Sequence, residues 1–264
     1  MASRISLRLL ALAYLGAILV APVAVIAYKT FEPGLGSVWE SVSTPAAVHA
    51  FWLTLQVAAV AVPLNAALGV LTAMALVRGR LPGRRLVEAV IDLPFAISPV
   101  VVGLALLLLY GREGWFGDSL AAAGIQVLFS FPGILLATIF VTLPFVVREV
   151  APVLREVGDE QEQAAATLGA SRWQAFWRVT LPAIRWGLVY GIVLSTARAI
   201  GEFGAVSVVS GKVSGETETL TLLVEKRFQN FDLSGAYAAS TLLALIALAT
   251  LGGMILVNRR KELS

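Results

Sequence analysis

Long apolar runs alternate with shorter polar segments along the whole chain. A helix that crosses a bilayer needs about 20 mostly apolar residues. The six runs that meet this length are approximately Leu7–Tyr28, Phe51–Val77, Leu86–Tyr110, Gly133–Leu154, Trp186–Ser210 and Tyr237–Val257. The pattern therefore predicts an all-α membrane protein with six transmembrane helices.

The first apolar run has two interpretations. Arg4 and Arg8 could form the basic start of a secretory signal peptide, but about 20 apolar residues favour a retained span. The composition agrees with a membrane protein, because the mean hydropathy is +0.84 and only 14% of residues are charged, against about 25% in soluble domains. The chain has no cysteine, which excludes disulfide and thiolate chemistry within it.

Basic residues are sorted by membrane side, and this sorting predicts the topology. If both termini are cytoplasmic, the inner segments hold Arg4, Arg8, Arg78, Arg80, Arg84, Arg85, Arg148, Arg155, Arg172, Arg178, Arg185, Arg259, Arg260 and Lys261. The outer segments hold only Lys29, Arg112, Lys212, Lys226 and Arg227. This strong positive-inside bias favours a multi-pass protein of the plasma membrane with both termini inside. The small net charge of +3 gives no reason to expect a nucleic-acid partner.

A polar segment, Asp159–Pro182, lies between the fourth and fifth apolar runs and faces the cytoplasm in this topology. Asp159 followed by Glu162 predicts a capping box at the start of a helix, and Gly169 predicts its end. We expect this helix to belong to a folded helix–turn–helix that offers a docking surface to a soluble partner.

The second half of that segment carries its own helix signals. Ser171 followed by Gln174 predicts another capping box, and we expect Pro182 to limit this second short helix. Three aromatic residues between these points could pack the second helix against the membrane domain. They are Trp173, Phe176 and Trp177.

Prolines occur inside several predicted spans, at Pro63, Pro94, Pro99 and Pro144. A membrane helix tolerates proline where neighbouring groups satisfy the freed carbonyl, so packing kinks are one explanation. The other is that Pro94 and Pro99 open the third span along a transport pathway.

The string QAAATLG, then nine residues, then VTLP resembles the EAA loop of ABC-importer permeases, written E-A-A-x3-G-x9-I-x-L-P. The resemblance implies a type I ABC-importer permease fold in which this loop is a coupling helix seated on a cytoplasmic ATP-binding subunit. The residues that it assigns to the loop are Glu162, Gln163, Ala164, Ala165, Gly169, Leu181 and Pro182. Gln163 replaces the usual glutamate, and Glu160 or Glu162 is a candidate to supply the missing charge.

Two further strings narrow the resemblance. DLPFAISPVVVGLALLLLYGREGWFG (92–117) and ARAIGEFGAVSVVSG (197–211) are similar to the W-type permease subunits of sulfate/thiosulfate importers. The similarity covers about residues 45–257 and implies import of sulfate or thiosulfate by alternating access. A molybdate or tungstate permease acting as a homodimer is the alternative, because such permeases carry a string like ARAIGEFGA. A stand-alone secondary transporter is a further alternative, although the inverted repeats expected of one are not evident.

A doubly charged anion needs polar groups along its route, because a bare charge in hydrocarbon is costly. Arg198 is the basic residue deepest in a predicted span, and Glu202 lies four residues on, so the two can pair on one helix face. One interpretation is a neutralised pair that fixes the span, and the other is that Arg198 meets the anion. Candidate hydroxyl donors are Ser195, Thr196 and Ser207, although small residues also serve helix packing. Asp92, near the inner end of the third span, is expected to cap or pair.

The resemblance also implies the assembly. Lys212 follows Gly211 but lacks the P-loop pattern around it, so we expect no enzyme activity or cofactor on this chain and place ATP and Mg²⁺ on a partner. The expected partners are a homologous T-type permease, two copies of an ATP-binding subunit, an extracytoplasmic sulfate-binding protein and the lipid bilayer. We expect no metal site. The chain is divided into an N-terminal helix with its outer loop (1–48), a permease core (49–257) and a basic tail (258–264).

Overall fold

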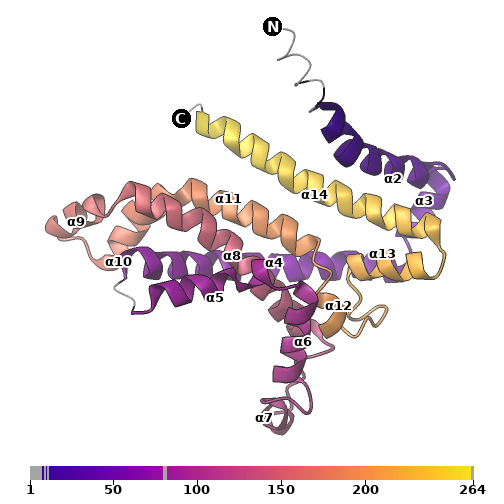
Figure 1. Ribbon diagram of the computed structural model, residues 1–264, viewed down its shortest axis with the longest axis horizontal. Coiled ribbons are helices and arrows are strands. Elements are labelled where there is room, and N and C mark those ends of the chain that lie inside the picture. Colours follow the sequence, from indigo (N-terminus) through magenta and orange to yellow (C-terminus); the bar gives the residue numbers. More distant parts are fainter. Residues whose placement is uncertain (1–7, 9, 11, 80–81, 263–264) are drawn as a thin grey trace.

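The computed structural model describes residues 8, 10, 12–79 and 82–262, and within these the regular structure is helical. The elements are η1 (Gly16–Val20), α2 (Ala21–Phe31), α3 (Leu35–Val42), α4 (Pro45–Arg78), α5 (Arg84–Ala96), α6 (Pro99–Tyr110), α7 (Gly117–Ala122), α8 (Phe131–Val157), α9 (Glu160–Thr167), α10 (Arg172–Ala175), η2 (Phe176–Thr180), α11 (Leu181–Ile200), α12 (Val206–Val209), α13 (Leu220–Gln229) and α14 (Leu233–Glu262). Figure 1 shows α4, α5, α8 and α11 running along one elongated bundle, with α9 at one end and α13 at the other. We name these the α9 end and the α13 end.

The described residues contain five helices that are long and apolar enough to cross a membrane. They are Leu12–Phe31, Pro45–Arg78, Phe131–Val157, Arg172–Ile200 and Leu233–Thr250. The helix pair α5 and α6 passes the same test together and brings the total to six if it forms one span. The expected all-α membrane fold is therefore confirmed.

The third predicted span is not one continuous helix. α5 ends at Ala96, α6 begins at Pro99, and the two axes are bent by 113°. Ser98 is extended, with φ −58° and ψ 135°, as expected of a residue before proline, because the proline ring disfavours the helical region there. Figure 1 shows α6 leaving the bundle with α7 at its tip. The expectation of one helix over 86–110 is therefore wrong, whereas Pro94 is accommodated inside α5.

The fifth predicted span is displaced toward the α9 end. One 29-residue helical stretch runs from Arg172 to Ile200 through α10, η2 and α11, so Pro182 does not end a short helix as expected. A π-turn over Phe176–Thr180 precedes Pro182, and a membrane helix tolerates proline where such a local π adjustment helps to satisfy the freed carbonyl. At its other end the helix stops at Ile200 rather than continuing to Ser210.

α4, α8 and α11 form the centre of the bundle and pack closely. An added Cβ at Gly69 of α4 would lie 2.6 Å from Val146 Cγ1, and one at Gly191 of α11 would lie 2.9 Å from Val146 Cα. These glycines let both helices approach α8. Asn65 strengthens the same contact, since its Nδ2 donates to Thr142 Oγ1 of α8 at 2.6 Å.

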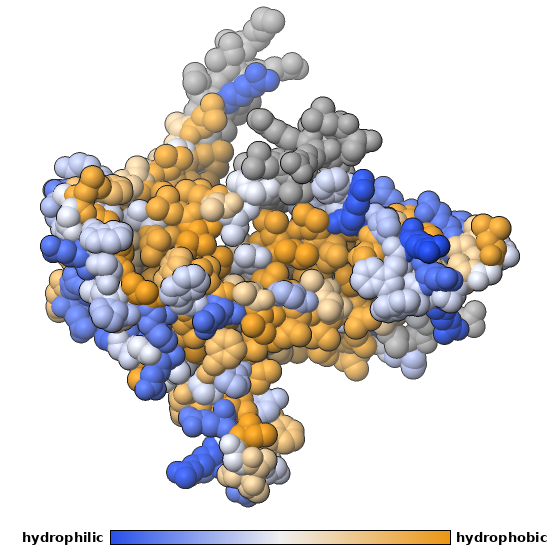
Figure 2. Space-filling view, turned by 180° about the vertical axis from the view of Figure 1, so that it is seen from behind, coloured by the Kyte–Doolittle hydropathy of each residue, from blue (hydrophilic) through white to orange (hydrophobic). Residues whose placement is uncertain are grey.

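The surface agrees with a membrane-embedded bundle. Figure 2 shows a broad orange, hydrophobic band across the middle of the molecule and blue, hydrophilic side chains toward both ends. Large apolar side chains are exposed on the apolar helices, including Leu71 of α4 at 62% and Leu108 of α6 at 68%. A contiguous apolar surface of this kind indicates contact with lipid or with another membrane chain.

Candidate coupling site and anion pathway

α9 forms a short projecting turn at the end of the bundle (Figure 1). Gly158 connects it to α8 with φ 68°, and Gly169 closes it with φ 84°. Both lie in the left-handed region that favours glycine. Ala170 N donates to Ala165 O at 3.0 Å and completes the terminal turn. The predicted stop at Gly169 is therefore confirmed.

The two predicted capping boxes have different outcomes. At the second helix, Gln174 N donates to Ser171 Oγ at 3.3 Å and Ser171 N donates to Gln174 Oε1 at 2.8 Å, which confirms that box. At α9, Asp159 is the N-cap residue but its side chain accepts no capping hydrogen bond. The predicted box there is wrong because the Glu162 carboxylate is drawn to tertiary partners.

Those partners are Arg78 and Thr180. Arg78 Nε lies 3.3 Å from Glu162 Oε2, and Thr180 Oγ1 donates to Glu162 Oε1 at 3.0 Å. In this structure Glu162 therefore faces its own chain. Gln163 and Glu160 are both exposed.

The second half of α9 and its closing turn expose small and apolar residues, whereas the first turn exposes the charged Glu160. Ala164 is exposed, Ala165 is half-buried, and Leu168 at the closing turn is 88% exposed. The EAA motif does not include Leu168. An apolar residue directly before a helix-ending glycine in a polar segment is nevertheless a sequence signal that could have identified it as part of the docking surface. Of the other two motif residues, Leu181 packs against the core around Val146, and Pro182 is exposed.

The three aromatic residues after α9 were expected to pack the second helix against the membrane domain, and one of them does so. Phe176 packs against the core cluster of α4, α8 and α11. Trp173 and Trp177 are 69% and 50% exposed, although their ring centroids lie 5.4 Å apart in an edge-to-face contact. Of these three aromatic residues, Phe176 is the one that packs against the core of the membrane domain in the part of the chain that the structure describes.

Arg198 and Glu202 are brought together as predicted, although Glu202 lies just beyond the end of α11. Arg198 Nη1 lies 2.6 Å from Glu202 Oε2. The Glu202 side chain is 1% exposed and that of Arg198 is 31% exposed. Ala205 N also donates to Glu202 Oε1 at 2.9 Å. The carboxylate is thus fixed while part of the guanidinium is accessible.

The candidate hydroxyl donors do not join this pair. Thr196 Oγ1 donates to Ile192 O at 2.7 Å, and Ser207 Oγ donates to Gly204 O at 2.8 Å. Ser195 is fully buried, and its hydroxyl has no hydrogen-bond partner among the described residues. In this structure the three hydroxyls are turned to their own backbone or buried in helix packing.

Asp92 pairs rather than standing alone, as expected. Arg148 Nη2 lies 3.0 Å from Asp92 Oδ1, and the same guanidinium lies 4.4 Å from the Phe95 ring centroid. Glu88, one turn earlier on α5, contacts Arg155 at 3.1 Å. These ion pairs join α5 to α8, and hydropathy gave no signal for them.

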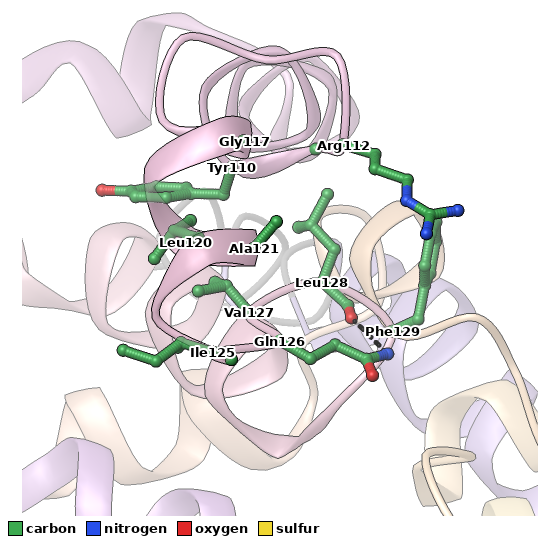
Figure 3. Close-up of a pocket in the computed structure, with 12 residues that line it drawn as sticks. Tyr110, Arg112, Gly117, Leu120, Ala121, Ile125, Gln126, Val127, Leu128 and Phe129 are labelled. Atoms are coloured by element: carbon green, nitrogen blue, oxygen red, sulfur yellow. Dashed lines mark hydrogen bonds between the residues drawn. The ribbon is translucent and has the colours of Figure 1, made fainter.

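A cavity of about 600 Å³ lies between α6, α7 and the segment leading to α8. Figure 3 shows Arg112 and Gln126 at its polar side and Leu120, Val127 and Leu128 within it. Gln126 Nε2 donates to Leu128 O at 3.2 Å. None of the predicted site residues lines this cavity. In the part of the chain that the structure describes, no group of His, Cys, Asp or Glu is arranged to hold a metal.

The bent α5–α6 pair, the close α4–α8–α11 packing and the projecting α9 define a type I ABC-importer permease. The fold matches a bacterial ABC transporter involved in the import of the acidic polysaccharide alginate, with a TM-score of 0.78 and 18% identity over 97% of this chain and 94% of that one. It also matches the MetNI methionine ABC transporter, with a TM-score of 0.59 and 18% identity over 81% and 94% of the two chains.

Residues 65–262 match the family described as binding-protein-dependent transport system inner membrane component, and the chain belongs to this family. It is 51% identical to the sulfate transport system permease protein CysW of Synechocystis over 92% of this chain and 88% of that protein. It is 50% identical to CysW of Escherichia coli, over 89% and 80%. The CysT permease of E. coli is 41% identical over 89% and 87%.

Proposed function

We propose that this chain is the W-type permease subunit of an ATP-driven importer that brings sulfate or thiosulfate into the cytoplasm. The observation that carries the proposal is the 51% identity to a sulfate permease over 92% of the chain. The lower identity of 41% to a T-type relative supports the W-type assignment. The chain itself carries out translocation, and a separate subunit carries out ATP hydrolysis.

In the proposed assembly a T-type permease forms the second half of the pathway. Two ATP-binding subunits, which hold ATP and Mg²⁺, dock on the cytoplasmic side, and an extracytoplasmic binding protein delivers the anion. A solved alginate transporter with the same fold carries a periplasmic protein bound to an alginate pentasaccharide. The sorting of basic residues supports an orientation with the α9 end and both termini in the cytoplasm.

The α9 turn is the proposed coupling helix. Its exposed Leu168 and small alanines suit insertion into a groove of an ATP-binding subunit, and Gly169 sets the turn that presents them. Closure of the two ATP-binding subunits would then move α9 together with the spans to which it is attached. Alternating access follows if that movement opens the pathway outward and hydrolysis resets it.

Arg198 is the proposed contact for the anion within the pathway. A guanidinium presents several N–H donors to an oxyanion, and the buried Glu202 fixes this one from behind. An unpaired arginine in hydrocarbon would be costly. The carboxylate therefore keeps the cation at its place between transport events.

The substrate can be tested with the purified complex reconstituted in lipid with its binding protein. We expect sulfate to stimulate ATP hydrolysis. Stimulation by molybdate alone would favour the homodimeric molybdate or tungstate permease and overturn the sulfate assignment. Uptake by this chain without any ATP-binding subunit would instead indicate a secondary transporter.

The coupling role can be tested with Gly169→Asp, since aspartate at a left-handed position adds strain and a charge to the docking turn. The variant should prevent assembly with the ATP-binding subunit or separate ATP hydrolysis from transport. Normal assembly together with normal uptake would contradict the coupling role.

A further inference from the structure

The end of α4 carries a contact that the coupling motif does not include. Arg78 is the last residue of α4, and its side chain is 19% exposed. Its guanidinium contacts three other parts of the chain. We name the set Arg78, Leu154, Gly158, Glu162 and Thr180 the Arg78 node. From this geometry we propose that Arg78 is a positioning residue that transmits movement of α9 to α4 and α8. This inference rests on the proposed coupling role of α9.

The first part of the node joins α4 to the end of α8. Arg78 Nη1 donates to Leu154 O at 3.0 Å, and Nη2 donates to Gly158 O. The last carbonyls of a helix lack partners within it and carry partial negative charge. The guanidinium therefore caps α8 at the turn that leads into α9.

The second part joins the same guanidinium to α9. Its Nε and Nη2 each lie 3.4 Å from Glu162 Oε1, and Nε lies 3.3 Å from Glu162 Oε2. The Glu162 side chain is 25% exposed, so this ion pair is less screened by water than a surface pair. Any displacement of Glu162 therefore acts directly on Arg78.

The third part joins α9 to the fifth span. Thr180 is 3% exposed and lies at the end of the π-turn, and its hydroxyl donates to Glu162 Oε1. One carboxylate is therefore held from α4 on one side and from the start of α11 on the other. The end of α4 and the residue before α11 therefore meet at a single residue of the proposed coupling helix, and the end of α8 is joined to them through Arg78.

Arginine suits this place because its planar fork offers five N–H donors in fixed directions. Lysine offers three donors from one point, so it cannot reproduce the same set of carbonyl and carboxylate contacts. Without Arg78, α9 would stay attached by its flanking glycine turns, at Gly158 and Gly169, and by the hydrogen bond between Thr180 and Glu162. Glycine has few conformational restrictions, so we expect part of the movement of α9 to be absorbed in these turns.

The test uses the complete reconstituted transporter and measures sulfate uptake per ATP hydrolysed. We expect Arg78→Gln to lower this ratio about fivefold or more, which is the lower end of coupling between distant sites. The amount of ATP-binding subunit that copurifies should stay unchanged, because Arg78 lies behind the docking face. Arg78→Lys should restore part of the ratio. Arg84→Gln is the matched control, since Arg84 forms its ion pair with Glu88 within α5 rather than with Glu162 of α9.

Two milder variants keep the proposal testable if the transporter with Arg78→Gln fails to assemble. Glu162→Gln removes the charge, and Thr180→Val removes only the hydroxyl, so each weakens one side of the node. Both should lower uptake per ATP while the melting temperature of the complex is maintained. Wild-type ratios in Glu162→Gln and Thr180→Val would overturn the inference. The Gly169→Asp variant separates the two proposals. If it also assembled and transported normally, the coupling role of α9 itself would be refuted. If it failed to assemble or to transport, the coupling role would stand and only the inference about Arg78 would be refuted.

Discussion

Gly169→Ala isolates the backbone requirement of the docking turn. Gly169 has φ 84°, and no atom lies within 4 Å of the place that a Cβ would occupy. The substitution therefore adds no clash and only the cost of a left-handed conformation, about 1–2 kcal/mol for a residue with a Cβ. The free permease can relieve this strain by rotating the turn away from the conformation that docks. Binding must then restore the strained conformation, so the affinity for the ATP-binding subunit should fall about 5- to 30-fold.

A second glycine supplies the control. Gly215, in the segment between α12 and α13 at the opposite end of the bundle, has φ 80°, and a Cβ added there would likewise meet no atom within 4 Å. Gly215→Ala should therefore cost the same strain without touching the docking turn. Gly169→Asn should have a smaller effect than alanine, because asparagine tolerates the left-handed region better.

The assay titrates the ATP-binding subunit against the solubilised permease pair and measures the dissociation constant for each variant. We expect Gly169→Ala to weaken binding, Gly169→Asn to weaken it less and Gly215→Ala to leave it unchanged. Equal dissociation constants for Gly169→Ala and Gly215→Ala would refute the reasoning, since strain at the turn would then have no role in docking.

Three other substitutions test separate parts of the molecule. Arg198→Ala should reduce uptake more than docking of the binding protein, and unchanged uptake kinetics would leave Arg198 only a packing role. Leu168→Asp should reduce copurification of the ATP-binding subunit about tenfold or more, because it puts a charge where an apolar side chain is buried on docking; equal copurification would contradict this. Gly191→Val should destabilise the α8–α11 contact by about 1–3 kcal/mol, measured by thermal unfolding against Gly36→Val.

The apolar segments were predictable from the sequence because a bilayer imposes a minimum apolar length on every crossing helix, and five of the six appear as single long helices in the described residues. Helix continuity was not. Hydropathy stays high through Ile97 and again through Ala205 and Val206, so both breaks are invisible to it. The proline pattern carried the better signal for the first break, since Pro99 restricts Ser98. At Gly201 the chain turns away although the sequence becomes mainly apolar again directly after Glu202.

The coupling motif was likewise predictable in position but not in orientation. Local capping rules assigned Glu162 to the start of α9, and the structure assigns it to Arg78, 84 residues earlier in the chain. The contact with Arg78 has a charge on both partners, whereas a capping hydrogen bond from a backbone N–H to the carboxylate has a charge on one partner only. A single sequence does not reveal that the end of α4 and the start of α9 meet.

This orientation changes how the missing charge at Gln163 is interpreted. Glu162 is held inward by Arg78 and Thr180, so it is not available to a docking partner in this arrangement. Glu160 lies in the first turn of α9, where an acid stabilises the positive end of the helix dipole. What α9 presents outward at its closing turn is Leu168, together with the neutral Gln163 and Ala164. Recognition by the proposed ATP-binding subunit would then depend on apolar fit more than on an ion pair, while the charge on α9 links it to its own spans.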